Sequence, residues 1–328
     1  MEISNLAITS FKEWLSSPPP ELIQEATESN PWFNEFNIRY ALQAFSDLME
    51  TSALKEFWER GKDLSPQKII WILSGNIPGA GFHDLLSAIA TPGESILKLS
   101  HQDSPLINAL AKKLFEIYPS AQKRVSLTST LPNDVDLVIG SGSDLTSRLL
   151  SEVWPYQPKL LRGNRFSIAV LEEIQDYKAL AFDILLYNGL GCRNVSHIIS
   201  FLPNPPDSFL QALLNWPQDN LSKSYQEKLK WEKACQQVYP KSFSLPDSLP
   251  IVIQSATTIR PCETGTLQWV KVNSVSEREA ILKEASPQIQ IIVGRDCKEG
   301  RSQHPGLWDY ADQIDPVEWI RTSMLDKN

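Results

Sequence analysis

The chain of 328 residues carries a net charge of −8 and is 42% hydrophobic. This length is too great for one small core and predicts two domains. The acidic balance argues against general binding of nucleic acid or of an anionic membrane, although a local basic pocket for a phosphorylated ligand stays open. No uncharged apolar run approaches the length of a membrane span, so no transmembrane segment is expected.

The cysteines and histidines indicate the compartment and argue against a metal centre. The cysteines are far apart and form no CxxC pair, which favours a reducing cytoplasm. The early Glu2 and the lack of a long apolar N-terminal run predict no secretory signal. The histidines have no metal-ligand spacing, so we expect no metal site. These residues are Cys192, Cys235, Cys262 and Cys297, and His83, His101, His197 and His304.

Residues 1–66 are predicted to form an N-terminal helical segment that packs against the rest of the chain. Its helices are expected before 16–20, from Glu21 onward, and over 38–59, where apolar residues recur at helical spacing. From Gln67 strands and helices alternate, which predicts a parallel sheet with crossover helices, a doubly wound nucleotide-binding architecture. The expected strands are 68–73, 95–99, 124–128, 136–139, 159–161 and 166–170, and the expected helices are 83–90, 105–118 and one ending at Glu152.

Ligands of such a sheet bind beyond the carboxyl ends of the strands, so the loops there hold the candidate binding residues. Asn76 lies in a Gly-flanked loop, where its amide could donate to a developing oxyanion or bond its own turn. Lys98 ends a strand, where it could reach a ribose hydroxyl or phosphate, or remain an exposed lysine. Gly142 and Ser143, in GSGSD at 140–144, open a helix whose N-terminus suits a phosphate, although an ordinary turn would look the same.

The stretch 179–201 contains the strongest candidate for chemistry. An apolar helical run over 179–187 stops at Asn188, a turn with Gly191 and Cys192 follows, and then a strand-like run. Gly191 is expected to let the backbone turn tightly beside Cys192. A thiol on such a turn can face a cleft, where backbone N–H groups stabilise both a thiolate and an oxyanion. The alternative is a small buried core thiol. A serine hydrolase is disfavoured because the sequence has no G-x-S-x-G elbow.

The second half of the chain is expected to form another α/β unit. We expect a catalytic domain over 191–300, after a dinucleotide-binding domain over 67–190 and before a C-terminal tail over 301–328. The expected strands are 251–255, 267–272 and 289–293, the expected helices are 209–214, 221–238 and 277–285, and a loop is expected over 244–250.

Taken in order, these motifs resemble the aldehyde dehydrogenase superfamily, and most closely its fatty acyl-CoA reductase branch, the LuxC-type reductases. Residues 74–78 (SGNIP) resemble the loop with the oxyanion-binding asparagine, and 97–105 (LKLSHQDSP) resembles the segment that holds the adenosine ribose. Residues 142–144 (GSD) resemble the helix start at the pyrophosphate, and 162–167 (RGNRFS) resembles the segment after it. Cys192 falls where the family has its nucleophile. The resemblance covers residues 67 to about 300 and implies two doubly wound α/β domains with the catalytic cysteine between them.

The sequence departs from the superfamily in ways that bear on the chemistry. The family's general-base glutamate would fall at Leu161 or Arg162, and the lack of a carboxylate there suits a reductase, which must protect its acyl-enzyme from water. The ribose-binding glutamate of the first domain would fall at His101. An acid there repels a 2′-phosphate, so His101 beside Lys98 favours NADPH over NADH. Glu263 is the counterpart of the ribose-binding glutamate of the second domain.

The resemblance therefore implies NADPH-dependent reduction of an acyl-CoA to an aldehyde through a covalent acyl-enzyme on Cys192, with Asn76 as an oxyanion donor. The alternatives are an oxidising aldehyde dehydrogenase that uses the same cysteine, and a non-catalytic nucleotide- or acyl-binding member of the fold. Acyl chain length, an acyl-carrying protein partner and a homo-oligomer stay open. The implied cofactor-binding residues are Lys98, His101, Gly142, Ser143 and Glu263.

Overall fold

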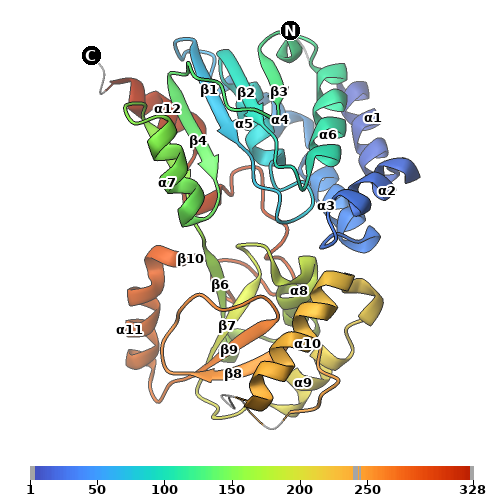
Figure 1. Cartoon of the computed structure of the whole chain (residues 1–328), viewed down its shortest axis with the longest axis vertical. Helices are drawn as coiled ribbons and strands as arrows, with labels where there is room; N and C mark the ends of the chain where they lie inside the picture. Colours follow the sequence, from blue (N-terminus) through green and yellow to red (C-terminus); the bar gives the residue numbers. More distant parts are fainter. Residues whose placement is uncertain (1–3, 239–242, 244, 326–328) are drawn as a thin grey trace. The chain divides into compact units, whose positions relative to one another are not determined.

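The computed structural model describes residues 4–238, 243 and 245–325, and it divides the chain into two compact units (Figure 1). The first unit comprises residues 1–164 together with 306–328, and the second comprises 165–305. Ser244, at the start of the predicted 244–250 loop, and the outermost residues of the predicted end segments lie outside the described residues.

The first unit contains a five-stranded parallel sheet with the order β3-β2-β1-β4-β5. In the central strand, Ile69 and Trp71 join the core on one face of the sheet, while Ile70 and Ile72 join the core on the other. Both faces are covered, so these strands are nearly continuous apolar runs, and the predicted strands are confirmed. The strands are β1 (Gln67–Ile72), β2 (Gly93–Lys98), β3 (Val125–Thr128), β4 (Leu137–Ser141) and β5 (Lys159–Arg162).

The helices of the first unit agree with the prediction except at two places. The expected helix over 38–59 is two helices. The first ends at Leu48 with Met49 as its C-cap, and Glu50 caps the second by accepting from the backbone N–H groups of Ser52 and Ala53. The second difference is α12, which lies in the predicted tail. The helices are α1 (Asn5–Ser16), α2 (Pro20–Ser29), α3 (Glu35–Leu48), α4 (Thr51–Glu59), α5 (Phe82–Ala90), α6 (Ser104–Ile117), α7 (Asp144–Val153) and α12 (Pro316–Leu325).

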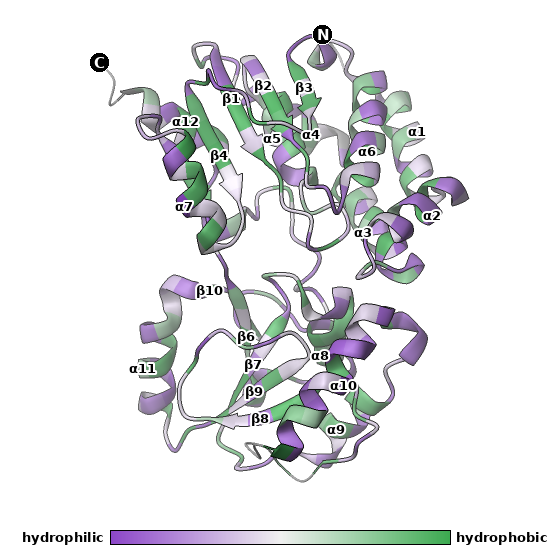
Figure 2. Ribbon diagram, viewed as in Figure 1, coloured by the Kyte–Doolittle hydropathy of each residue, from purple (hydrophilic) through white to green (hydrophobic). Residues whose placement is uncertain are grey.

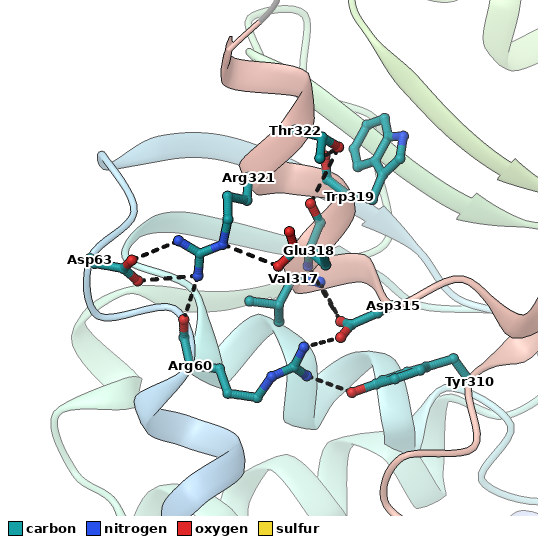
Figure 3. A network of polar contacts seen from close by, with 9 residues as sticks. All are labelled: Arg60, Asp63, Tyr310, Asp315, Val317, Glu318, Trp319, Arg321 and Thr322. Carbon is teal, nitrogen blue, oxygen red and sulfur yellow. Dashed lines mark hydrogen bonds and ion pairs between the residues drawn. The ribbon is translucent and has the colours of Figure 1, made fainter.

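The C-terminal segment is part of the first unit and not a separate tail. Arg321 lies 2.6 Å from Asp63. Figure 3 shows this ion pair and the bonds from Arg60 to both Asp315 and Tyr310. Val317 and Ile320 of α12 lie in the same core cluster as the N-terminal helices and β1. Helix α12 is thus held to the first unit by apolar packing as well as by ion pairs.

The second unit contains a separate five-stranded parallel sheet with the order β10-β6-β7-β9-β8. Strand β6 belongs to this sheet, since it pairs with β7 and β10, and its Ile168 and Val170 pack with Ile199. The observed division therefore differs from the expected boundary at 190. The elements are β6 (Phe166–Val170), α8 (Tyr177–Leu185), β7 (Val195–Ser200), α9 (Asp207–Leu214), α10 (Lys223–Val238), β8 (Val252–Ala256), β9 (Thr266–Lys271), α11 (Val275–Ala285) and β10 (Ile289–Val293).

The predicted fold class, α/β with parallel sheets, is confirmed. Figure 2 shows hydrophobic residues along β1 and β4, whereas helices such as α7 and α11 carry both hydrophobic and hydrophilic residues. Within the described part of the chain, no helix has both the length and the apolar character needed to cross a membrane.

Candidate active site

The loop after β1 carries Asn76 at the carboxyl edge of the first sheet. The Asn76 side chain is exposed, and its Oδ1 accepts a hydrogen bond from Ser74 Oγ at 2.6 Å. This local bond is the one expected of a loop asparagine, and it uses the acceptor end of the amide. The donor end, Nδ2, is the group that oxyanion stabilisation requires.

A buried carboxylate that the sequence did not single out joins the Asn76 loop to the loop after β2. Asp103 accepts the backbone N–H of Gly79 through Oδ2 at 2.9 Å, and burial raises the pKa of Asp103 well above its usual range. The loops also touch at Gly75, where a Cβ atom would lie 2.2 Å from Ser100 Oγ. A side chain at position 75 would clash with Ser100, so glycine at this position allows the two loops to lie in direct contact.

Lys98 and His101 lie close together at the same edge of the sheet. Lys98 is the last residue of β2 and is half-buried, while His101 is exposed in the turn that follows. Neither side chain forms an ion pair with any residue that the structure describes. Two nitrogen-bearing side chains without a carboxylate partner can take an anionic group as ligand.

The loop after β4 leads into α7 through Gly142 and Ser143. Ser143 caps the helix, since its Oγ accepts the backbone N–H of Thr146 at 3.3 Å. A capped helix N-terminus at the carboxyl edge of a parallel sheet is a favourable place for a phosphate. Asn76, predicted as an oxyanion donor, and the predicted cofactor residues of the β2 and β4 ends therefore lie beside neighbouring strands of one sheet, β2, β1 and β4.

Arg162, at the end of β5, forms a buried ion pair at one of the two positions, Leu161 and Arg162, that the resemblance assigns to the superfamily's general base. Its Nη1 lies 2.6 Å from Asp84 Oδ1, and both side chains are less than a tenth exposed. A guanidinium offers only donors, so it is not a base. The carboxylate of Asp84 is occupied by this pair.

Cys192 lies in a β-turn just before β7, at the amino edge of the second sheet. The N–H of Asn194 donates to the carbonyl of Gly191 at 2.9 Å, which makes Cys192 and Arg193 the central residues of the turn. Ser167, the second residue of β6, donates from Oγ to the Cys192 carbonyl at 2.9 Å. The turn that the sequence predicted around Cys192 is thus present and hydrogen-bonded.

The backbone before this turn has an unusual conformation. Tyr187, Asn188 and Gly189 are consecutive residues with positive φ, at 53°, 58° and 69°. The left-handed residues therefore precede Gly191, which the sequence suggested as the turning point. Left-handed backbone costs roughly 1–2 kcal/mol for a residue such as tyrosine. Asn188 is buried and accepts the N–H of Ser222 at 2.9 Å, so packing holds this strained segment in place.

All four cysteines are free and partly exposed, so exposure alone does not distinguish Cys192. Cys235 lies within α10, and burial raises the pKa of the Cys262 thiol, which makes Cys262 a poorer nucleophile. Cys297 lies after β10 and its carbonyl accepts the N–H of Gly294. What distinguishes Cys192 is its place in the braced turn.

Glu263 lies in the second unit, in the loop before β9. Its side chain is 73% exposed and lies 3.0 Å from Lys228 Nζ, which also binds Glu232. Its carboxylate is thus paired with a lysine of its own unit. No group of three or more potential metal ligands is present among the described residues.

The fold defined by these two parallel sheets is that of the aldehyde dehydrogenases. The structure is similar to an NAD-dependent benzaldehyde dehydrogenase from Corynebacterium glutamicum, with a TM-score of 0.59 and 14% identity over 90% of this chain and 82% of that one. It is also similar to aldehyde dehydrogenase 21 from Physcomitrella patens, with a TM-score of 0.61 and 12% identity over 85% and 69% of the two chains.

Within that fold, residues 46–201 match the family described as Acyl-CoA reductase (LuxC), so the resemblance seen in the motifs is confirmed. A long-chain acyl-protein thioester reductase 2 from Photobacterium leiognathi is 26% identical over 54% of this chain and 42% of its own length. A long-chain acyl-protein thioester reductase from Aliivibrio fischeri is 25% identical over 49% and 38%. The match thus spans less than half the length of these relatives.

Proposed function

We propose that this protein reduces an acyl thioester to an aldehyde, with Cys192 as the nucleophile and NADPH as the reductant. The observation that carries the proposal is the partly exposed thiol in a hydrogen-bonded turn before β7. The family match and the thioester reductases named above support the substrate class. Free cysteines at all four positions support a reducing compartment, for which we propose the cytoplasm.

The reaction uses covalent catalysis in two halves. The Cys192 thiolate attacks the thioester carbonyl, and Asn76 and the Cys192 N–H stabilise the oxyanion. The C–S bond to the leaving thiol then breaks, the thiol departs and takes up a proton, and the acyl group remains on Cys192. When bound, NADPH supplies a hydride to the acyl carbonyl. The resulting thiohemiacetal releases the aldehyde and restores the Cys192 thiolate.

The residues at the carboxyl edge of the first sheet fit a phosphorylated dinucleotide. Lys98 and His101 supply hydrogen-bond donors without a competing carboxylate, and Ser143 caps a helix that can face a phosphate. We assign Lys98, His101, Gly142 and Ser143 to NADPH binding. Glu263 is the weakest member of the proposed set, because Lys228 already neutralises it.

The acyl donor in this proposal is an acyl-CoA, with an acyl-carrying protein as the second candidate because the named relatives are acyl-protein thioester reductases. The oxidising alternative requires a base that activates water. That base would fall at Leu161 or Arg162, where the chain has an apolar side chain and a guanidinium paired with Asp84, and this favours reduction.

The experiment that tests the proposal follows an acyl group on the protein by intact mass. Incubation with an acyl-CoA should give a one-acyl adduct, and NADPH should remove the adduct as aldehyde forms. Cys192→Ala should abolish both adduct and aldehyde, because no other thiol lies on such a turn in the described chain. Cys235→Ala, at another partly exposed cysteine, is the matched control and should behave as wild type. Undiminished aldehyde formation by Cys192→Ala would end the proposal.

A further inference from the structure

Asn194 is a buried side chain directly beside the proposed nucleophile, and its role is not evident from the sequence. It is 2% exposed and ends the turn that contains Cys192. Its Oδ1 accepts the N–H of Gly191 at 2.8 Å, while its own N–H donates to the Gly191 carbonyl at 2.9 Å. Two opposed hydrogen bonds therefore join the two ends of the turn.

The other end of the Asn194 amide fixes the turn to the end of helix α8. Its Nδ2 donates to the carbonyls of Asp183, Ile184 and Leu186 at 3.0, 3.4 and 2.8 Å. The last carbonyls of a helix have no partner within the helix, and buried carbonyls left without one are costly. The Asn194 amide therefore fixes the position of the turn relative to the end of α8. The residues between them, Tyr187 to Gly189, have positive φ.

We propose that Asn194 is a positioning residue that sets the reactivity of Cys192, an inference that rests on the proposed function. The central residues of a β-turn present their backbone N–H groups in similar directions, and such N–H groups attract an anion. Holding Cys192 and Arg193 in this turn keeps those dipoles on the thiolate and lowers the pH at which the thiol reacts. The bond from Ser167 to the Cys192 carbonyl braces the same turn from β6.

Two charged residues lie near the turn and bear on its titration. Arg193 is the other central residue and is partly exposed. Asp183 directs its carboxylate elsewhere, to the N–H groups of Gly300 and Ser302 and to the Ser302 hydroxyl. The contact of Asp183 with Asn194 is through its backbone carbonyl.

The experiment measures iodoacetamide alkylation of each cysteine by peptide mass spectrometry across pH, without turnover. In Asn194→Ala, the pH midpoint for Cys192 should rise by about one unit toward that of an ordinary thiol, while Cys235, Cys262 and Cys297 keep their rates. Tyr225→Phe is the matched control, since it removes one buried hydrogen bond, to the Pro250 carbonyl, from the same unit away from the turn. It should leave the Cys192 midpoint unchanged.

A second variant covers the case in which Asn194→Ala does not fold. Asn194→Ser is uncharged and keeps a hydroxyl that can accept from Gly191, but it loses the amide donors to α8, so the Cys192 midpoint should again rise. An unchanged midpoint in a folded variant overturns the proposal. Faster alkylation of all four cysteines in both variants also overturns it, because Asn194 would then serve only the fold. Failure of the proposed function itself would be seen in a different experiment, as undiminished aldehyde formation by Cys192→Ala.

Discussion

The two units place their candidate residues at opposite edges of two similar sheets. In the first unit, Lys98 ends β2, and Asn76 and Ser143 follow the carboxyl ends of β1 and β4. In the second unit, Cys192 precedes β7 and lies at the amino edge. A parallel sheet offers helix N-termini and turning loops at its carboxyl edge, which suits a phosphorylated cofactor. The amino edge has no such advantage, so a nucleophile there depends on side chains that shape its turn.

The supports of the two regions differ accordingly. The Asn76 loop is held by one buried carboxylate, Asp103, which accepts from Gly79. The Cys192 turn is held by Asn194 through four side-chain hydrogen bonds and by Ser167 through a fifth. Substitutions that test the Asn76 loop should therefore change its own exposed side chains. Substitutions that test the Cys192 turn should change the residues that bind it, Asn194 and Ser167.

Asn76→Ala should have the largest effect on turnover after loss of the proposed nucleophile, Cys192. Loss of one oxyanion donor typically lowers turnover on the order of a hundredfold or more. Because Asn76 is exposed and packs no core, the fold should survive. The measurement is kcat for aldehyde formation together with Kd for NADPH, and Kd should hardly change.

The control for this prediction is Asn108→Ala, which removes an exposed asparagine from α6 of the same unit. It should keep wild-type turnover. A change confined to cofactor Kd in Asn76→Ala would assign Asn76 to the cofactor and not to the oxyanion.

Strands and the order of elements could be predicted because buried parallel strands leave apolar runs in the sequence. The break between α3 and α4 could not, since the apolar spacing continues through Glu50 and only the structure shows its carboxylate capping a helix. Helix α12 was missed because the reason for its apolar residues Val317 and Ile320 is the core of the first unit, which is built from residues far away in the sequence.

The candidate site divides in the same way. Asn76 and Cys192 became candidates from the sequence because each lies beside glycine in a loop or turn between regular elements. Asn194 and Asp103 were not found, because their partners lie in other segments of the backbone, and an Asn or Asp in a turn looks the same whether or not it binds them. Residues that touch ligands can leave a local sequence pattern. Residues that hold a loop in place bind segments that only the fold brings near, so the sequence around them carries no such pattern.

Buried ionisable groups in the second unit give the next prediction. Burial raises the pKa of Asp183 to about 6, and burial lowers the pKa of His197 to about 4. A raised carboxyl pKa contributes stability at low pH that is lost as pH rises toward 6. A lowered histidine pKa contributes stability above pH 6.5 that is lost as pH falls toward 4. The two groups therefore oppose each other in one pH window.

When either group is removed, the pH dependence of stability should show the effect of the other group alone. In His197→Gln, the opening free energy of the second unit should rise by about 2 kcal/mol from pH 7 to 4.5, and in Asp183→Asn it should fall by about as much. The wild type should change less than either variant. Hydrogen exchange of peptides from β6 and β7, corrected for the intrinsic pH dependence, measures this. The same pH slope in both variants would show that these two groups do not govern acid stability.

The smallest expected effect concerns cofactor choice in the first unit. Lys98 offers a positive charge and three donors to a 2′-phosphate, and His101 adds a donor three residues later. A charge-assisted hydrogen bond is worth roughly 1.5–3 kcal/mol, so a preference for NADPH of about tenfold to a hundredfold is expected. Lys98→Ala should reduce that preference by about tenfold, and His101→Glu should reduce it further or reverse it, because a carboxylate repels the phosphate.

The assay compares kcat/KM and Kd for NADPH and NADH in wild type and both variants. Lys112→Ala removes an exposed lysine from α6 of the same unit, so it controls for a general change in charge and should keep the preference. If Lys98→Ala weakens the binding of NADPH and NADH to the same degree, Lys98 contacts a part of the dinucleotide that both cofactors have in common. If the wild type prefers NADH, or if both variants keep the NADPH preference, the loop after β2 does not hold the phosphorylated ribose. The contrast between a cofactor edge and a nucleophile edge would then rest on the α7 N-terminus alone.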